Sequence, residues 1–283
     1  MRKRGNIRKI MHPVIEHILE RKQKRVPTND GRKIALVLHG GLMTGIRGAG
    51  AMIALEELGL SRVFDVIYSV SAGLGNASYF ITEQAVLGTS VYYDDLSGNK
   101  FINFWRPWKI ADVDQVIHAV KDIKSLDVEK IWESKTKLFV RLLNPKAHRA
   151  EYLEIHSFPS KMYYTLLRAA IYIQYAVPGS VKINGRSYMD GEFTLRDGLE
   201  HDRSAVESDA TDILIIYNRR NQLREEIREN GRVCIIAPDS AWNLSRFETR
   251  TDVLKQAAIQ TGTLVKKVFG DNNPIHLDYH GRY

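Results

Sequence analysis

Short apolar runs alternate with amphipathic segments along this chain. Ile34–Leu38 is continuously apolar, and Val63–Val70 is a second, nearly continuous run. Runs of this length between turn residues are typical of strands that are buried on both faces of a sheet. The segment between them, Ala51–Leu58, has a helical period with Glu56 and Glu57 on its polar side. Strand, helix and strand in this order predict a parallel sheet with crossover helices.

The same pattern continues toward the C-terminus, with a less regular middle. Several amphipathic stretches occupy residues 87–165, and we expect mostly helices there. The fold class expected for the whole chain is α/β, with a mostly parallel central sheet flanked by helices in one domain over residues 34–283. The further elements expected are a helix over Ser71–Ala85, strands over Asp212–Tyr217 and Val233–Ala237, and a final helix over Thr251–Phe269.

The N-terminal extension, residues 1–33, differs from this domain in charge. It has 11 Lys/Arg and 3 Asp/Glu, so its net charge of +8 equals that of the whole chain and the domain is neutral. Pro13 can open a helix there. Its apolar stripe would comprise Val14, Ile15, Ile18 and Leu19.

A basic amphipathic helix of this kind either packs against the domain or lies on a membrane surface. Peripheral contact with anionic membrane through residues 1–25 is therefore one expectation. Deleting these residues should then lower vesicle binding and leave hydrolysis of soluble esters intact. No nucleic acid partner is expected, because nucleic-acid-binding domains usually spread basic residues over a face of the fold.

Composition narrows the setting further. The 283 residues are 44% apolar and 26% charged, which suits a globular protein with a large core. The one cysteine, Cys234, excludes an internal disulfide, and its apolar surroundings predict a buried thiol. No apolar stretch approaches the ~18–20 residues of a membrane span, and no secretory signal is evident. A cytoplasmic location, membrane-peripheral if the extension binds lipid, is expected.

A serine follows the second apolar run directly. Val63–Val70 runs into Ser71-Ala72-Gly73, where the next helix is expected to begin. A strand, a serine between small residues and a helix form the context of a nucleophile elbow. The helix start directs N–H groups and its positive dipole end at the serine. The usual G-x-S-x-G motif has Ser69 as its first residue here, and the plainer alternative for Ser71 is a helix N-cap.

A glycine-rich loop lies between the first expected strand and helix. His39–Gly45 contains Gly40, Gly41 and Gly45. Such a loop can bring backbone N–H groups close to a ligand oxygen, as a phosphate cradle or an oxyanion hole. It has neither the Gly-Lys-Ser/Thr of a Walker loop nor the spacing of a dinucleotide fingerprint.

With these motifs in order, the sequence resembles the patatin-like phospholipase family, over roughly residues 12–240. That family opens with a strand, a G-G-G-x-R/K-G loop, a helix ending near A-L-E-E-x-G, and the serine elbow. The matching segments are Gly40–Gly45, Ala54–Gly59 and Ser69–Gly73, followed by Leu167–Ala170, Ala176–Gly179, Val181–Gly185 and Tyr188–Gly191, with His12–Val14 in the extension.

The resemblance implies a three-layer α/β/α fold and a lipid acyl hydrolase that acts through a serine–aspartate dyad. Ser71 would be the nucleophile and Asp190 its base, with Asp197 as the competing aspartate. The substrate would be a phospholipid or another acyl ester, and no cofactor and no metal would be needed. The oxyanion hole would comprise Gly40, Gly41, Leu42 and Ala72. The supporting positions would be Ser69, Gly73, Gly45, Arg47 and Gly191.

The sequence departs from the family pattern at several positions. Leu42 replaces the third glycine of the loop, and a leucine does not easily adopt a positive φ. Thr44 stands where the family has a basic residue, with Arg47 as a shifted alternative. Glu192 follows Asp190-Gly191 and adds a second carboxylate near the dyad, which could raise the aspartate's pKa or hinder substrate. A catalytically weakened lipid-binding protein is therefore the alternative function.

The sequence also contains residues for two other kinds of site, a catalytic triad and a metal site. A Ser–His–Asp esterase would need a late histidine. The candidates are His201, His276 and His280. A metal site on the N-terminal helix is disfavoured, because His12 and His17 are five residues apart and do not share a helix face.

Overall fold

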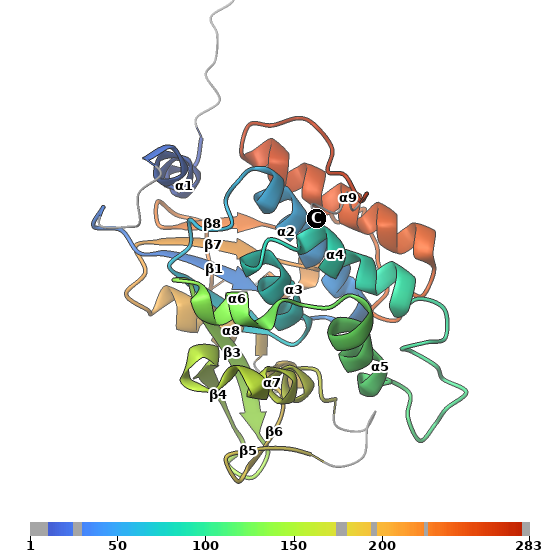
Figure 1. Cartoon of the computed structure of the whole chain (residues 1–283). Coiled ribbons are helices and arrows are strands. Elements are labelled where there is room, and N and C mark those ends of the chain that lie inside the picture. Colours follow the sequence, from blue (N-terminus) through green and yellow to red (C-terminus); the bar gives the residue numbers. More distant parts are fainter. Residues whose placement is uncertain (1–10, 25–29, 174–179, 194–196, 224–225, 279–283) are drawn as a thin grey trace, which may run out of the picture.

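The computed structural model describes residues 11–24, 30–173, 180–193, 197–223 and 226–278. Within these residues one central sheet lies between helices (Figure 1). The strands are β1 (Ile34–Leu38), β2 (Val66–Val70), β3 (Lys137–Asn144), β4 (Arg149–Glu154), β5 (Val181–Ile183), β6 (Arg186–Asp190), β7 (Asp212–Ile216) and β8 (Val233–Ile236). The α-helices are α1 (Pro13–Lys24), α2 (Ile46–Glu57), α3 (Ala72–Ile81), α4 (Ala85–Ser90), α5 (Val113–His118), α6 (Val128–Glu133), α7 (Tyr163–Ala170), α8 (Asp197–Val206) and α9 (Thr251–Val268).

The centre of the sheet is parallel. Its order is β5-β6-β3-β2-β1-β7-β8, with β4 paired to β3 off this path. The pairs β1–β2, β1–β7, β2–β3 and β7–β8 are parallel, whereas β3–β4, β3–β6 and β5–β6 are antiparallel. The expected fold class, a mostly parallel sheet flanked by helices, is confirmed.

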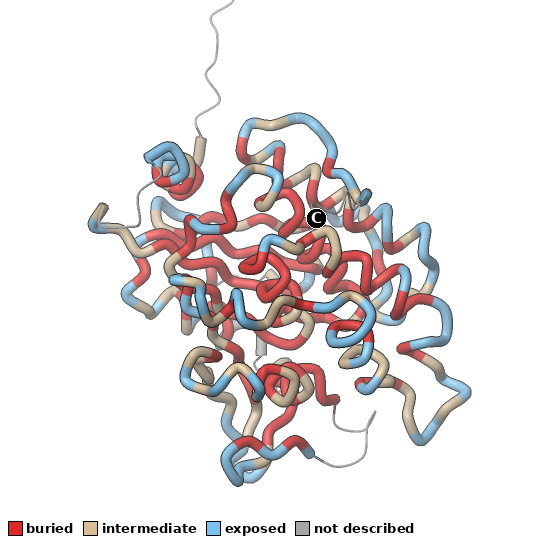
Figure 2. The backbone as a smooth tube through the Cα atoms, viewed as in Figure 1, coloured by how far each residue is buried: buried red, intermediate tan, exposed pale blue. Residues whose placement is uncertain are grey.

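Both faces of the central strands are covered, which explains their uninterrupted apolar sequence. On β1, Ile34, Leu36 and Leu38 join the larger core with α2, α3 and α9. Ala35 and Val37 join the smaller core on the opposite face, where α8 packs against β1, β2 and β7. Figure 2 shows the central strands mostly buried, with exposed residues toward the periphery. None of the described helices is both long and apolar enough to cross a bilayer.

Helix α1 packs onto this body beside β7 and β8. Val14, Ile15 and Ile18 of its apolar stripe are fully buried in the larger core. Near its end, the buried Arg21 donates hydrogen bonds to Asp30 (2.9 Å) and Asp65 and to two backbone carbonyls. Of the two alternatives left open for this helix, the structure shows the packed one.

Two sequence predictions of elements are corrected. Helix α2 begins at Ile46, before the expected Ala51. Its first turns contain glycines because the helix packs closely against α9 there: a Cβ on Gly50 would lie 2.3 Å from the Ala258 carbonyl oxygen. The middle of the chain also contains β3 and β4, where mostly helices were expected. The motif segment Ala176–Gly179 lies outside the described residues.

Candidate active site

The site begins at the sharp turn between β2 and α3. Ser71 has φ 54° and ψ −131°, a backbone conformation that residues other than glycine rarely adopt. Such strain costs on the order of 1–3 kcal/mol and persists only where the surrounding structure enforces it. Here a Cβ on Gly73 would lie 2.7 Å from the Leu38 carbonyl oxygen, so α3 packs closely against the end of β1. Ser69, in place of the usual glycine, donates its buried hydroxyl to the Phe139 carbonyl at 2.7 Å.

The sheet register brings a second chemical group to this turn. Val70, the last residue of β2, pairs with Arg141 of β3, and β3 continues beyond it. The next residue, Leu142, pairs with Asp190 of β6 on the edge that β2 has left, since β4 occupies the other edge of β3. The carboxyl ends of β2 and β6 therefore face each other along the same edge of β3. Ser71 directly follows the last residue of β2, and Asp190 is the last residue of β6.

These two side chains are in direct contact. Ser71 Oγ donates a hydrogen bond to Asp190 Oδ2 at 2.6 Å, and both residues are buried. Asp190 Oδ1 accepts from the backbone N–H of Glu192 at 2.9 Å. Burial, and then the negative charge of Glu192, raise the pKa of Asp190 well above its ordinary value. Asp197, the competing aspartate, is the first residue of α8.

The chain after Asp190 is fixed from β3. The buried Arg141 donates to the Gly191 carbonyl and to Glu200. A Cβ on Gly191 would lie 2.4 Å from the Arg141 carbonyl oxygen. This position therefore needs a glycine if the aspartate is to reach the serine.

The glycine loop lies against the nucleophile. A Cβ on Gly40 would lie 2.3 Å from Ser71 Cβ, so the backbone passes beside the serine. Gly41 has φ 139°, and Leu42 has φ 55° although it carries a side chain. Leu42 opens a 3₁₀ turn, η1 (Leu42–Gly45), which is fixed by Thr44 through two hydrogen bonds to the Gly41 carbonyl. The loop thus holds a leucine in a left-handed conformation that favours glycine.

An asparagine that the sequence analysis missed clamps this loop. Asn218 Nδ2 donates to the carbonyls of His39 (2.7 Å) and Gly40 (2.9 Å), and Gln222 Nε2 donates to Gly40 at 3.3 Å. In a trans peptide the N–H points opposite the C=O, so the N–H groups of Gly40 and Gly41 point away from Asn218. Asn218 comes shortly after β7, and its place near the carboxyl ends of parallel strands was a usable signal.

The supporting positions around the loop have structural partners. Arg47 donates to the carbonyls of Asn218 (3.2 Å) and Trp242, so it ties α2 to two other segments. Gly45 lies close to α3, because a Cβ there would be 2.8 Å from Ala72 Cβ. Thr44 is buried under the loop. These contacts do not place the Arg47 guanidinium at the serine.

Two other arginines, not identified from the sequence, lie beside the loop. A Cβ on Gly40 would be 2.6 Å from Glu192 Oε2 and 3.0 Å from Ser71 Oγ, so the glutamate and the serine approach the same point. Arg219 Nη2 lies 3.3 Å from Glu192 Oε1, and Arg246 Nη2 lies 3.7 Å from Glu192 Oε2. The second carboxylate expected near the dyad is thus present and held by two cations.

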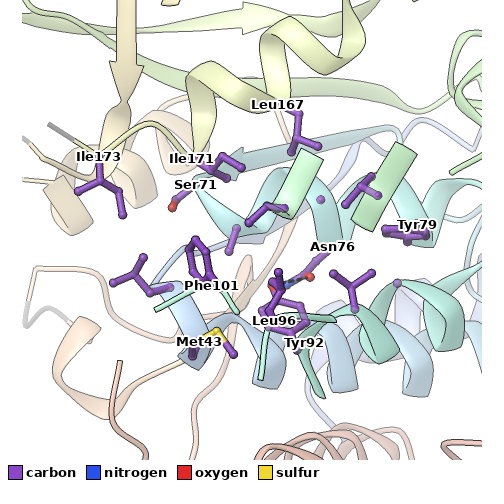
Figure 3. A pocket seen from close by; sticks show the side chains of 17 residues that line it. Met43, Ser71, Asn76, Tyr79, Tyr92, Leu96, Phe101, Leu167, Ile171 and Ile173 are labelled. Atoms are coloured by element: carbon purple, nitrogen blue, oxygen red, sulfur yellow. Dashed lines mark hydrogen bonds between the residues drawn. The ribbon is translucent and has the colours of Figure 1, made fainter. Parts of the chain in front are cut away.

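An apolar cavity of about 60 Å³ extends from Ser71 between α3, α7 and the segment after α4 (Figure 3). Leu42 and Ala72 line it together with Ser71. Its wall is otherwise mainly aliphatic and aromatic, and includes Met43, Tyr92, Leu96, Phe101, Leu167 and Ile171. A volume of this size holds a short chain, well below the ~300 Å³ at which drug-sized ligand pockets begin.

The two described histidines among the triad candidates, His201 and His276, have partners other than Ser71 and Asp190. His201 is buried and shares hydrogen bonds with the Leu38 carbonyl (3.1 Å) and the Tyr152 hydroxyl. Burial, followed by the charges of neighbouring groups, lowers the pKa of His201 well below its usual value. His276 pairs with Glu57 at 3.5 Å, and His280 lies outside the described residues.

One group of potential metal ligands occurs among the described residues, away from Ser71. His12, Glu229 and Cys234 each offer a ligand atom, and these atoms lie within 4.8 Å of one another. They come from the residue before α1, the segment before β8 and β8 itself. Burial, and then Glu229, raise the pKa of Cys234 to about 12, in keeping with the buried thiol expected from the sequence.

Comparison with known proteins adds little to this picture. The chain matches no family model, and no curated protein matches it. Among solved structures it is similar to VipD from Legionella pneumophila, with 13% sequence identity and a TM-score of 0.42 over 83% of this chain and 67% of that one. What the site can do chemically therefore has to follow from its own residues.

Proposed function

We propose that this protein is a lipid acyl hydrolase in which Ser71 and Asp190 form a catalytic dyad. The observation that carries the proposal is the 2.6 Å hydrogen bond between the serine hydroxyl and a buried carboxylate. Its setting supports it: a strained turn at the start of α3, beside a glycine loop and an apolar cavity. This combination of nucleophile, base, N–H groups and apolar site suits acyl transfer.

In the first half of the reaction, Ser71 Oγ attacks the acyl carbonyl carbon while Asp190 Oδ2 takes the hydroxyl proton. The tetrahedral oxyanion is stabilised by backbone N–H groups of Gly40, Gly41, Leu42 and Ala72. Leu42 and Ala72 each begin a helical segment, where an N–H has no acceptor within its own helix. As the tetrahedral state collapses, the alcohol leaves with the proton from Asp190 and an acyl-enzyme remains.

Hydrolysis follows the same path with water as nucleophile. Asp190 takes a proton from water, the hydroxide attacks the acyl carbon, and the serine regains the proton as the fatty acid leaves. The raised pKa of Asp190 makes its ionised form a stronger base than an ordinary carboxylate. No metal or organic cofactor enters these steps.

The apolar cavity suggests the acyl part of the substrate. Because it opens from Ser71 and is lined mainly by apolar side chains, it suits a hydrocarbon chain. At about 60 Å³ it favours short acyl groups, and longer chains would need its side chains to move apart. Rates measured across p-nitrophenyl esters of increasing chain length would therefore fall beyond the shortest members.

The dyad is tested with p-nitrophenyl ester hydrolysis by wild type, Ser71→Ala and Asp190→Asn. Both substitutions should lower kcat by about 10³-fold or more, since nucleophile and base act as a unit. Thermal unfolding of each variant controls for folding. The matched control is Ser240→Ala, an exposed serine far from the dyad in sequence. Retention of activity in either dyad variant would refute the proposal.

A second candidate is a lipid-binding protein with weak or no catalysis. Glu192 favours it, because a carboxylate beside the glycine loop opposes an oxyanion in the same place. Labelling with a fluorophosphonate separates the candidates: an active dyad reacts covalently at Ser71. A well-folded wild type that neither reacts nor hydrolyses esters would favour lipid binding.

A further inference from the structure

The long connection between α4 and α5 exposes an unusual group of aromatic side chains. Phe104, Trp105 and Trp108 are 62%, 88% and 72% exposed, and Phe247 from the segment before α9 is 48% exposed. Of five large apolar side chains exposed among the described residues, these are four. The ring of Phe247 contacts that of Phe104, with centroids 5.4 Å apart. Isolated exposed apolar residues are common, but a cluster of this kind marks an interaction surface.

The aromatic tip, residues 103–110, is held by its base. Ile102 and Ala111 form an antiparallel bridge, and hydrogen bonds from Asn103 to Ile110 and from Asp112 to Phe101 extend it. The connection projects from the body of the molecule at the right of Figure 1, and Figure 2 shows its outer part exposed. The fold therefore presents these aromatic rings to solvent on an ordered support.

The composition of the tip fits the interfacial zone of a phospholipid bilayer. Tryptophan is enriched there because its ring is apolar and its N–H remains able to bond to polar groups. Residues 99–110 contain Lys100, Arg106 and Lys109 and no acidic residue. Arg106 pairs with Asp112 and Lys109 with Asp112 and Asp114, all at the base, and Lys100 donates to a backbone carbonyl. The tip thus combines aromatic rings with basic groups, two kinds of side chain that suit the interface of an anionic bilayer.

The same connection reaches the candidate active site. Its buried residue Phe101 lines the cavity that contains Ser71, whereas Trp105 and Trp108 are exposed to solvent. Figure 3 shows Phe101 among the side chains of that cavity. We infer that the aromatic tip docks the protein on a phospholipid membrane, with Trp105 and Trp108 in the interface and the Ser71 cavity close to the bilayer. The role of the cavity in this inference depends on the proposed hydrolase function, whereas the docking itself does not.

The test uses the full chain and vesicles of phosphatidylcholine with a fraction of phosphatidylglycerol. Trp105→Ala/Trp108→Ala should weaken sedimentation with vesicles by about tenfold or more. Its hydrolysis of soluble p-nitrophenyl esters should stay at the wild-type level. Ile123→Ala, which removes the remaining exposed large apolar side chain, is the matched control and should bind vesicles like wild type.

Tryptophan fluorescence provides an independent measurement. In Trp132→Phe/Trp242→Phe only the tip tryptophans emit, and vesicles should shift this emission to shorter wavelength. In Trp105→Phe/Trp108→Phe the remaining tryptophans should show no shift. Unchanged vesicle binding by the double alanine variant, with no shift from the tip tryptophans, would overturn the inference and leave a protein partner as the occupant. If the tip docks but wild type hydrolyses no ester, only the proposed function fails.

Discussion

At the residue scale, the surroundings of Asp190 oppose its ionisation, although the proposed mechanism needs it as an ionised base. The carboxyl group is buried, close to a second carboxylate, and faces a neutral hydroxyl. Arginine charge from Arg246 favours ionisation, but burial and Glu192 outweigh it and the pKa is raised. A group needed as a base is thus kept in an environment that disfavours its charged form, a common compromise at catalytic sites.

This tension predicts that Asp190→Asn stabilises the fold while it abolishes activity. Because the folded-state pKa is raised, the unfolded chain loses the aspartate proton first as pH rises above ~4, and wild-type stability falls until the folded pKa is reached. Asparagine has no such loss. The variant should therefore gain about 1 kcal/mol at pH 8 and nothing near pH 4 or below.

Urea unfolding at the two pH values measures this difference. Asp209→Asn is the control, because that aspartate is exposed and its pKa is lowered by Lys33. Equal stability differences at pH 4 and pH 8 would contradict the assignment of a raised pKa to Asp190.

A related prediction concerns Glu192. Replacing it with glutamine removes the nearby negative charge, and with it the charge that Arg219 and Arg246 contact at this position. Both changes favour ionised Asp190, so its pKa should fall. Since the base acts when ionised, the acidic limb of the kcat/KM profile should shift to lower pH.

The plateau of the same profile reports on the oxyanion. Without the Glu192 charge beside the glycine loop, kcat at high pH should equal or exceed that of wild type. Glu207→Gln, at an exposed glutamate just after α8, should leave the profile unchanged. A shift of the acidic limb to higher pH in Glu192→Gln would contradict this electrostatic account.

At the scale of elements, the site depends on where neighbouring strands end. Strand β3 extends beyond the end of β2. Strand β6 pairs with β3 along the same edge from that point, so the ends of β2 and β6 face each other. On the other side, β7 leads into Asn218, which fixes the carbonyls of the glycine loop. The nucleophile, the base, the glycine loop and Asn218 thus lie at the ends of β2, β6, β1 and β7, which the sheet holds in register.

Asn218→Ala tests the contribution of this clamp. The His39 carbonyl would lose the Asn218 donor and the Gly40 carbonyl would keep only the weaker bond from Gln222, which should cost about 1–3 kcal/mol of stability. The loop N–H groups would lose their fixed direction, so kcat should fall by roughly 10²-fold with a smaller change in KM. Asn273→Ala, an exposed asparagine near the C-terminus, provides the control.

Fluorophosphonate labelling of Ser71 separates a positioning role from general destabilisation. If Asn218 positions the loop, labelling should slow in parallel with kcat in protein that remains folded. Loss of stability with unchanged kcat and labelling would show that Asn218 only supports the fold.

The sequence predicted elements and site residues to different extents for physical reasons. Buried parallel strands and the elbow are contiguous signals, so β1, β2 and the turn at Ser71 follow directly from the sequence. Strand β3 was missed because Lys137 and Arg141 interrupt its apolar pattern, and Arg141 is buried through bonds to distant segments. Asn218 and the arginines around Glu192 were missed for a similar reason, since tertiary folding alone brings them together.

At the scale of the whole molecule, the N-terminal helix belongs to the body rather than to a detached arm. The sequence favoured deletion of residues 1–25 as a way to remove membrane contact without loss of esterase activity. The structure changes that expectation, because α1 buries its apolar stripe against the sheet and Arg21 joins Asp30 and Asp65. Among the described residues the aromatic tip remains the candidate for lipid contact, and residues 2–10 add five basic side chains in the sequence.

Two deletions distinguish these contributions. Removing residues 1–25 exposes the sites of Val14, Ile15 and Ile18, each worth about 1.5–3 kcal/mol of burial, and leaves Asp30 and Asp65 without their arginine. A loss of about 5 kcal/mol or more is comparable to the whole stability of many domains, so this variant should unfold or aggregate.

Removing residues 2–10 spares α1 and takes away five basic side chains. That variant should unfold like wild type in urea, hydrolyse soluble esters normally, and bind anionic vesicles more weakly only at low salt, where surface charges are least screened. A stable, active protein that lacks residues 1–25 would show that α1 is not needed for the fold. If the protein that lacks residues 2–10 loses vesicle binding at every salt concentration, a purely electrostatic role for the basic segment is contradicted.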